Sequence, residues 1–200
     1  MIVFEYFPLI SFLILISLIS GRVVFLKRKG IKVSSGSKKI SKKAFFIYPA
    51  FFPVLLMWLY ELSKPAFHFS FYFVPEALVK PLTESVFLKI SGVLVIAAAL
   101  ILLLITLLHF RNSLRFGLDE KNPGKLVTTG IFSISRNPFF LSFDLYFLGI
   151  AILLPGIFFV GFAVLTFTSI HFFILKEEKF MQGVYGDEYL EYKRKVRRYL

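Results

Sequence analysis

Two short polar motifs in this chain of 200 residues have side chains suited to binding a small charged molecule. The first, Ser-Arg-Asn-Pro, occupies residues 135–138, and the second is the acidic pair Glu177-Glu178. A guanidinium is a forked donor that binds carboxylates, whereas a carboxylate among aromatic rings binds ammonium or sulfonium cations. Together the two motifs could therefore hold a ligand that carries charges of both signs.

The two acidic side chains of the second motif are not equivalent. Neighbouring residues on a helix point about 100° apart, so only one of Glu177 and Glu178 can face such a ligand directly. Two glutamates where a helix leaves a membrane are equally compatible with charge that is simply solvated. The pair becomes informative only if another polar group lies opposite it.

Pro138 predicts that a helix begins within the first motif. Proline is tolerated in the first turn of a helix and disfavours helical geometry at the residue before it. Asn137 is therefore predicted to be the N-cap, with its side chain accepting hydrogen bonds from first-turn backbone donors. With Arg136 beside it, this helix start would favour an anionic group; an ordinary helix cap next to an arginine at the membrane surface remains the alternative.

The composition indicates the elements that must position these motifs. Apolar residues make up 57% of the chain and the mean hydropathy is +0.76, which is far above the usage of soluble domains. The absence of cysteine excludes a disulfide framework and a thiolate metal site, and we expect no metal. A helix of about 20 apolar residues spans a bilayer. Five apolar runs approach that length: 7–26, 44–62, 86–110, 139–154 and 157–175.

We therefore predict an all-α integral membrane protein with about five transmembrane helices. It would form a single membrane domain over residues 1–200, with three spans in 1–110. Residues 111–200 would supply a cofactor-binding connection, a helical hairpin and an amphipathic C-terminal helix.

The basic residues predict how the chain is oriented. Twenty of the 24 Lys and Arg residues lie in three segments, 27–43, 111–138 and 176–200. Such segments face the cytoplasm in multi-pass proteins, which places the C-terminus and both polar motifs on the cytoplasmic side. Charge that lies between apolar runs, rather than along one stripe, argues against a nucleic-acid partner.

A helical hairpin would bring the two motifs together. If the last two spans turn at Pro155-Gly156, residues whose numbers sum to 311 lie at equal depth, so Glu178 is level with Ser133. The motifs then meet at the cytoplasmic surface, where we expect a cofactor pocket. Deeper in the hairpin, His171 either lines a path for a substrate or makes a structural hydrogen bond. Asp144 is expected to hydrogen-bond a threonine of the opposite helix, Thr166 or Thr168.

The C-terminal residues show a helical period. Gly186 and Asp187 are typical of a helix end followed by an N-cap. Tyr189, Tyr192, Val196 and Tyr199 then recur at helical spacing, which predicts an amphipathic helix that continues to the end of the chain. Its basic face would lie on anionic lipid or bind an anionic substrate.

Two segments resemble the isoprenylcysteine carboxyl methyltransferase family and its relatives, the integral-membrane phospholipid methyltransferases. The segments are SLRFGLDEKNPGKLVTTGIFSISRNPFF (113–140) and EEKFMQGVYGDEYLEYKRKVRRYL (177–200). They are similar to the family's Leu-Val-x-x-Gly-x-Tyr and Arg-His-Pro-x-Tyr motifs, and to its Glu-Glu block, which is followed by Phe-Gly-x-x-Tyr-x-x-Tyr and a terminal arginine. The resemblance implies a multi-span enzyme that uses S-adenosylmethionine, releases S-adenosylhomocysteine, and methylates a lipophilic acceptor in a membrane lipid environment.

The resemblance also implies the residues of the site. Glu177 or Glu178 would bind the polar groups of the cofactor, and Arg198 would lie near the acceptor. Glu178, Arg198 and His171, the last from the depth pairing, are the candidate catalytic residues. Asn137 and Phe140 stand where relatives often have His and Tyr, so a general base at either position is not expected. The implied cofactor-binding residues are Leu126, Val127, Gly130, Ile131, Phe132, Arg136, Asn137, Pro138, Phe140, Glu177 and Glu178.

Three questions stay open at the level of sequence. The acceptor could be a prenylcysteine-like carboxylate, a phospholipid-like amine or a small apolar molecule. Lys195 and Arg197 compete with Arg198 for the position of the family's terminal arginine. The function itself is also open. An NADPH-dependent membrane sterol or steroid reductase, which has a similar C-terminal half, is one alternative. A non-catalytic membrane scaffold, which would need neither S-adenosylmethionine nor NADPH, is the other.

Overall fold

The structure, a computed structural model, describes residues 2–31, 42–111 and 125–200, with backbone alone for 42–51. The described residues are predominantly helical and contain no β-strand, which confirms the all-α prediction for this part of the chain. In chain order the helices are α1 (Ile2–Arg28), α2 (Lys42–Phe67), α3 (Glu76–Val79), α4 (Val86–His109), the 3₁₀ helix η1 (Gly130–Ser133), α5 (Pro138–Leu153), α6 (Ile157–Tyr185) and α7 (Asp187–Lys195).

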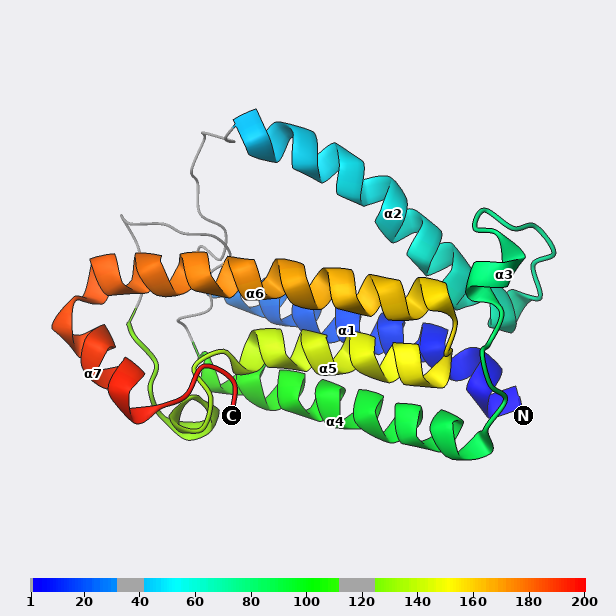
Figure 1. Ribbon diagram of the computed structural model, residues 1–200. Helices are drawn as coiled ribbons and strands as arrows, with labels where there is room; N and C mark the ends of the chain where they lie inside the picture. The colour runs from blue at the N-terminus through cyan, green and yellow to red at the C-terminus, as the bar shows by residue number, and fades with distance from the viewer. Residues whose placement is uncertain (1, 32–41, 112–124) are drawn as a thin grey trace.

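Four of the long helices form a bundle. Helices α1, α4, α5 and α6 run alongside one another, with the main contacts between α4 and α5 and between α5 and α6, while α2 diverges from the bundle toward its N-terminal end (Figure 1). The start of α1, the short helix α3 and the α5–α6 turn lie at one end of the bundle. The opposite end carries η1, α7 and the C-terminus (Figure 1), so the predicted polar motifs gather there.

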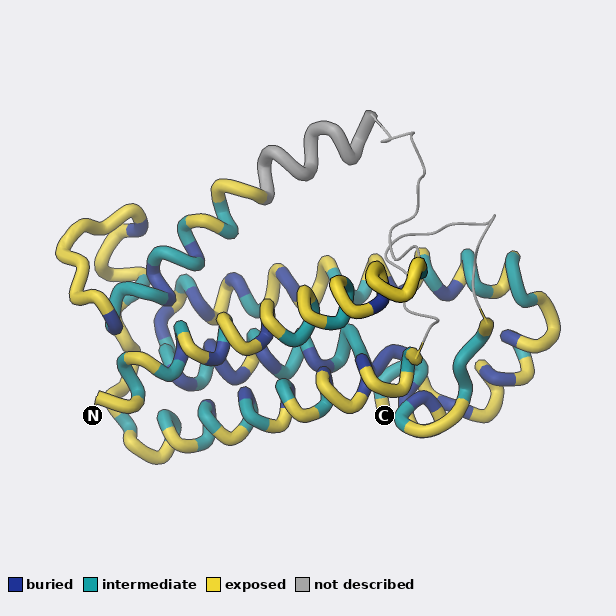
Figure 2. The backbone as a smooth tube through the Cα atoms, turned by 180° about the vertical axis from the view of Figure 1, so that it is seen from behind, coloured by how far each residue is buried: buried dark blue, intermediate teal, exposed yellow. Residues whose placement is uncertain are grey.

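In the part of the chain that the structure describes, three helices are long and apolar enough to cross a membrane: α1, α4 and α6. Helix α5 is apolar but has only 16 residues. Large apolar side chains face outward, and Figure 2 shows exposed residues along the outer sides of the helices. Leu94, Val164 and Phe172 are each more than 60% exposed. Surfaces of this kind are unfavourable in water and suit hydrocarbon, so the protein is a membrane protein.

An aromatic core joins α1, α2, α5 and α6. The buried Trp58 of α2 stacks on Phe162 of α6, with 5.2 Å between the ring centroids, and meets Phe147 of α5 edge-on at 5.4 Å. The Ser11 and Tyr146 hydroxyls, 3.1 Å apart, add a polar tie between α1 and α5. Aromatic pairs of these geometries each contribute about 0.5–1.5 kcal/mol beyond their burial, so the core holds the hairpin against the N-terminal helices.

Two glycines let α4 and α5 pack with their backbones close together. A Cβ added to Gly92 would lie 2.7 Å from the Leu153 backbone nitrogen, and one added to Gly149 would lie 2.6 Å from Ile96 Cγ1. Only hydrogen atoms fit in these spaces. This close contact fixes the position of α5 relative to α4. It therefore also fixes the position of the residues that precede α5.

The hairpin turns where the sequence predicts, since α5 ends at Leu153 and α6 begins at Ile157. Helix α6 continues beyond the apolar run, which ends at Leu175, as far as Tyr185, so it ends at Gly186 as the sequence predicts. Gly186 ends it at a φ of 53°, a left-handed geometry that glycine adopts without strain. The ten additional residues extend the helix by about 15 Å and carry Glu177 and Glu178 on the same rigid element.

Candidate active site at the end of the hairpin

Arg136 and Glu178 form an ion pair where α6 passes the start of α5. The Arg136 Nη2 atom lies 2.8 Å from Glu178 Oε1, and both side chains are only 6% exposed. The two side chains meet here because the turn sets the helices antiparallel and Arg136 lies just before Asn137, the N-cap residue of α5. The expectation that the two polar motifs lie together agrees with this geometry.

Arg198 completes the cluster from the C-terminal segment. Its Nε atom donates to Glu178 Oε1 at 3.0 Å and its Nη2 atom donates to Oε2 at 2.9 Å, a bidentate pair. The hydrogen bond with Glu178 raises the pKa of the Arg198 guanidinium above its usual value. Two guanidiniums share one carboxylate, so the cluster has a net positive charge and favours an anionic group.

The segment that carries Arg198 is extended and not helical. Helix α7 ends at Lys195, and the backbone then pairs with residues 135–137. The Arg136 backbone N–H donates to the Arg197 carbonyl at 3.0 Å. The prediction of a helix that continues to the end of the chain is therefore wrong beyond Lys195, because hydrogen bonds to the start of α5 replace those of the helix.

Asn137 also differs from its predicted role. It occupies the N-cap position of α5, but its side chain makes no capping hydrogen bond. Its Nδ2 atom instead donates to the Arg198 carbonyl at 3.1 Å, and Ser135 Oγ reaches the same oxygen at 3.4 Å. The asparagine therefore holds the C-terminal segment in place. Because it binds the carbonyl of Arg198 itself, it also fixes the backbone position from which the Arg198 side chain extends toward Glu178.

A 3₁₀ turn, not predicted from the sequence, shapes the connection before α5. Gly130 opens it at a φ of 65°, and a Cβ there would overlap the His109 ring. Phe132 is buried, and its carbonyl accepts a 2.6 Å hydrogen bond from the Tyr192 hydroxyl. The turn is thus held between the end of α4 and helix α7.

A small apolar cluster attaches α7 to the same connection. It consists of Tyr189, Tyr192 and Val196, with Leu126 packed against them. Burial raises the pKa of Tyr189 to about 12, so its hydroxyl stays protonated at neutral pH and can only act as a hydrogen-bonding group. The sequence predicts an apolar face on α7 correctly but does not indicate that it covers Leu126.

The other predicted cofactor residues lie in or beside this connection. Val127 and Ile131 are partly buried, Pro138 is buried at the start of α5, and Phe140 packs edge-on against Phe139 and near Phe173. The first part of the family-like segment, 113–124, lies outside the described residues.

Two polar groups of the site have no protein partner among the described residues. The Arg136 Nε atom is buried without a hydrogen bond. The Glu177 carboxylate, one residue from the ion-paired Glu178, makes no hydrogen bond or ion pair with any part of the chain that the structure describes. A free donor and a free carboxylate therefore lie beside the cluster.

Tyr199 connects the site to the interior of the hairpin. Its hydroxyl and His171 Nδ1 share a hydrogen bond of 2.8 Å, and the two rings are stacked with 6.1 Å between centroids. The predicted hydrogen bond of Asp144 with a threonine is wrong, because Thr166 and Thr168 bond to carbonyls of their own helix. The sequence does not indicate that Tyr199 contacts His171, because Tyr199 continues the helical spacing of Tyr189, Tyr192 and Val196.

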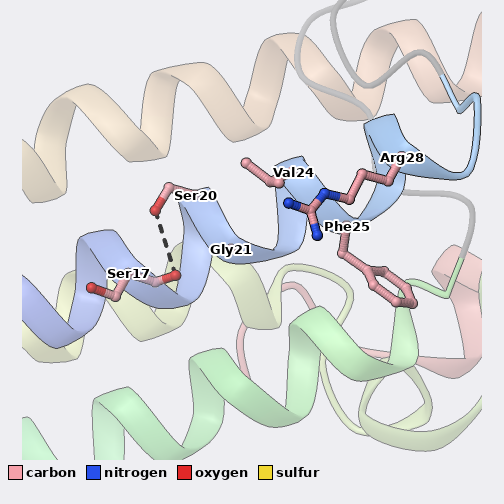
Figure 3. A pocket seen from close by; sticks show the side chains of 6 residues that line it. All are labelled: Ser17, Ser20, Gly21, Val24, Phe25 and Arg28. Atoms are coloured by element: carbon pink, nitrogen blue, oxygen red, sulfur yellow. Dashed lines mark hydrogen bonds between the residues drawn. The ribbon is translucent and has the colours of Figure 1, made fainter.

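A hollow on the outer face of α1 lies apart from this cluster. Figure 3 shows its six lining residues and the hydrogen bond of 3.5 Å that the Ser20 hydroxyl donates to the Ser17 carbonyl. None of these six residues belongs to the predicted site. The described residues contain no group of three or more His, Asp or Glu side chains placed to bind a metal ion.

Comparison with protein families gives one match, to the phospholipid methyltransferase family, over residues 87–188. The matched region runs from α4 to the start of α7 and contains the Arg136–Glu178 pair. A search of the curated proteins finds no match. Since the family match covers just over half of the chain, the protein belongs to the phospholipid methyltransferase family, whose members are membrane enzymes that methylate lipids.

Proposed function

We propose that this protein transfers a methyl group from S-adenosylmethionine to a lipophilic acceptor at the cytoplasmic face of a membrane. The observation that supports this most directly is the Arg136–Glu178–Arg198 cluster, which joins three separate segments at the end of the apolar hairpin. In this proposal α2 and α5 also cross the bilayer, giving five spans, and the residues around the cluster line a cytoplasmic cofactor pocket.

The free groups of the site fit the charges of the cofactor. S-adenosylmethionine carries a carboxylate, an ammonium and a sulfonium. The unpartnered Arg136 Nε would donate to the carboxylate, and Glu177 would accept from the ammonium. The adenosine part would lie along the connection before α5, against Leu126, Val127, Gly130, Ile131 and Phe132, with Asn137, Pro138 and Phe140 closing the pocket at the start of α5.

Glu178 has a positioning role in this proposal. Both of its oxygens accept hydrogen bonds from arginines, so it orients Arg136 toward the cofactor and Arg198 toward the acceptor. His171, which lies deeper, would contact the acceptor through its ring edge. The three residues proposed to act near the chemistry are thus Glu178, Arg198 and His171, with Glu178 acting through its neighbours.

Methyl transfer needs few protein groups. The bound cofactor supplies an activated methyl group on a sulfonium. The protein has to hold the acceptor atom in line with that methyl group and to keep water away, which restricts orientation and lowers the barrier. An interlocked cluster at a lipid-facing helix end suits this task, because the acceptor arrives from the bilayer and the cofactor from the cytoplasm.

Calorimetry with the purified protein in detergent tests the proposal. We expect heat from S-adenosylmethionine and from S-adenosylhomocysteine, and none from NADPH. Heat from NADPH alone would indicate a reductase, and no heat from any of the three would indicate a scaffold. Either result would contradict the proposed function.

Glu177→Gln is expected to weaken binding of S-adenosylmethionine about tenfold or more without lowering the unfolding temperature. Glu177 has no partner in the described structure, so its replacement breaks no contact there, whereas a charge-assisted hydrogen bond to the cofactor is worth about 1.5–3 kcal/mol. Glu188→Gln, an exposed change on α7, is the control and should leave the affinity unchanged. Equal affinities of the Glu177 variant and the unmodified protein would remove Glu177 from the site.

The proposed orientation can be tested by labelling single cysteines, because the chain has none of its own. Glu188→Cys lies on exposed α7 and Lys80→Cys in the exposed segment before α4. A membrane-impermeant maleimide should label the Lys80 variant in intact cells and the Glu188 variant only after the membrane is opened. The reverse pattern would overturn the orientation.

A further inference from the structure

The α5–α6 hairpin is short for a unit that crosses a membrane. Helix α5 has 16 residues, which is about 24 Å of helix, whereas the hydrocarbon layer of a bilayer is about 30 Å thick. If the ion-pair cluster lies at one membrane surface, the turn between α5 and α6 ends about 6 Å inside the other. Backbone that is not helical occurs at such a depth only where protein covers it. The turn therefore needs a cover.

The connection from α2 to α4, residues 68–85, supplies that cover. Its short helix α3 lies at the same end of the bundle as the turn (Figure 1). The Leu82 backbone N–H donates to the Pro155 carbonyl at 2.9 Å. A Cβ added to Gly156 would lie 2.7 Å from the Val79 carbonyl oxygen, so the two backbones are in direct contact. The connection is thus fixed to the hairpin turn.

Most of the connection is exposed (Figure 2), and its first part displays aromatic rings. Tyr60 of α2 organises them, because its ring stacks on Phe69 with 5.4 Å between centroids and meets Phe73 edge-on at 4.8 Å. The Tyr60 hydroxyl also donates to the Phe71 carbonyl at 2.8 Å. Five side chains, each more than 40% exposed, form this aromatic array: Phe67, Phe69, Phe71, Tyr72 and Phe73. Rings that are held in fixed positions and left uncovered form a surface for an apolar partner.

Charged side chains are kept away from the aromatic array. Residues 65–75 contain no Asp, Glu, Lys or Arg. Next to the array, the Lys64 ammonium lies over the Tyr72 ring and 3.8 Å from a Glu61 carboxylate oxygen. The Glu61 side chain is only 2% exposed and that of Lys64 only 14%. Burying two charges against each other is costly for a loop in water, but it keeps them out of contact with a surrounding apolar medium.

We propose that the aromatic array is embedded in the lipid of the leaflet opposite the ion-pair cluster, so that the α2–α4 connection caps the hairpin turn inside the membrane. Aromatic rings favour the interfacial layer of a bilayer. Directly after the connection, the first turn of α4 exposes Val86 and Phe87, so exposed apolar side chains flank the connection at both ends.

The charged residues of the connection fit this placement. Glu76, Lys80 and Glu84 are all exposed and all follow the array along the chain, so they would reach the headgroups and water. The inference concerns the end of the bundle away from the candidate active site. It therefore does not depend on the reaction that the protein performs.

Two single-cysteine variants in phosphatidylcholine nanodiscs test the placement: Phe71→Cys within the array and Lys80→Cys outside it. With an environment-sensitive fluorophore attached, bromine on the lipid acyl chains should quench most of the emission at position 71 and little at position 80. Without the fluorophore, a membrane-impermeant maleimide should react about tenfold more slowly with the Phe71 variant, because a thiol in a poorly hydrated layer ionises less and the thiolate is the reacting form.

Two other patterns would overturn the proposal. Equal maleimide rates of the two variants would place the array in water. Slow reaction of the Phe71 variant without quenching by the brominated lipid would show that protein, such as a second copy of the chain, covers the array. If Phe71→Cys does not fold, Phe67→Cys provides the same test, because its side chain is 58% exposed.

Gly156→Ala tests whether the connection covers the turn. The added methyl group would overlap the Val79 carbonyl oxygen and push the connection away, which should lower the unfolding temperature by about 2 °C or more. The Leu82 amide proton, released from the Pro155 carbonyl, should also exchange faster with solvent.

Gly161→Ala is the matched control, because a Cβ at this position of α6 meets nothing within 4 Å. This variant should show neither a lower unfolding temperature nor faster exchange at Leu82. If Gly156→Ala has the same unfolding temperature and Leu82 exchange rate as the unmodified protein, the connection does not cap the turn.

Discussion

Glu178→Gln is expected to abolish methyl transfer and to lower the free energy of unfolding by about 3 kcal/mol, since removing one partner of a buried ion pair costs roughly 3–5 kcal/mol. The change leaves Arg136, with 6% of its side chain exposed, beside Arg198 with no carboxylate between them. Arg198 is 31% exposed, so water compensates part of its loss, which places the expected cost at the low end of that range.

Thermal unfolding in detergent and transfer of a radiolabelled methyl group measure the two effects. Glu191→Gln is the matched control, because it breaks an ion pair with Lys195 in which both side chains are more than 60% exposed. Exposed pairs of this kind contribute little to stability, so this variant should resemble the unmodified protein. An unfolding temperature of Glu178→Gln equal to that of Glu191→Gln would show that the cluster does not stabilise the fold.

A chain that stops after Lys195 is expected to lose methyl transfer completely and at least tenfold in affinity for S-adenosylhomocysteine. Residues 196–200 supply the Arg198 side chain and the carbonyls that bind the Arg136 N–H and the Asn137 side chain. Without them, the Arg136 side chain keeps its ion pair with Glu178 and a long hydrogen bond of 3.4 Å to the Lys193 carbonyl, but several buried donors at the start of α5 lose their acceptors. Such unpaired donors each cost about 1–3 kcal/mol.

The helices themselves should survive this truncation, because none of them includes residues beyond Lys195. Circular dichroism should therefore show an unchanged helical signal. Removal of Leu200 alone, a residue that is 70% exposed, is the control and should preserve both affinity and transfer. A truncated protein with undiminished affinity would show that the cofactor does not depend on the C-terminal segment.

The hairpin could be predicted because it depends on local features of the sequence. Pro138 at a helix start, two apolar runs and the Pro155-Gly156 turn determine the direction and length of both helices. The constant rise of a helix then fixes which residues lie level with one another. The proximity of the Ser-Arg-Asn-Pro motif to Glu177 and Glu178 follows from these features, whereas the choice of Glu178 as the partner of Arg136 does not.

The C-terminal segment could not be predicted in the same way, because its conformation depends on distant partners. Tyr189, Tyr192, Val196 and Tyr199 have helical spacing, yet only the first two lie in α7. Beyond Lys195 the backbone gains hydrogen bonds from residues 135–137, a contact that no local pattern reveals. The role of Asn137 was missed for the same reason, since its partner is a carbonyl of this segment.

Asp144 illustrates a different limit. A threonine on the opposite helix is the simplest partner for a carboxylate within the membrane, and the depth pairing offers two. Hydroxyls on helices also bond readily to carbonyls of the preceding turn, and both threonines do so here. The sequence could identify the aspartate as unusual, but it could not indicate that no described residue would bind the carboxylate.

The uninterrupted course of α6 has a consequence for how the protein responds to its surroundings. His171 and Glu178 are seven residues apart on this one helix, so about 10 Å of rigid rod separates them. Bilayers that are thicker or thinner than the apolar stretch are accommodated by tilting such a rod as a whole. The spacing between the proposed donor and acceptor ends of the site is thereby independent of lipid chain length, and the same geometry is kept in membranes of different composition.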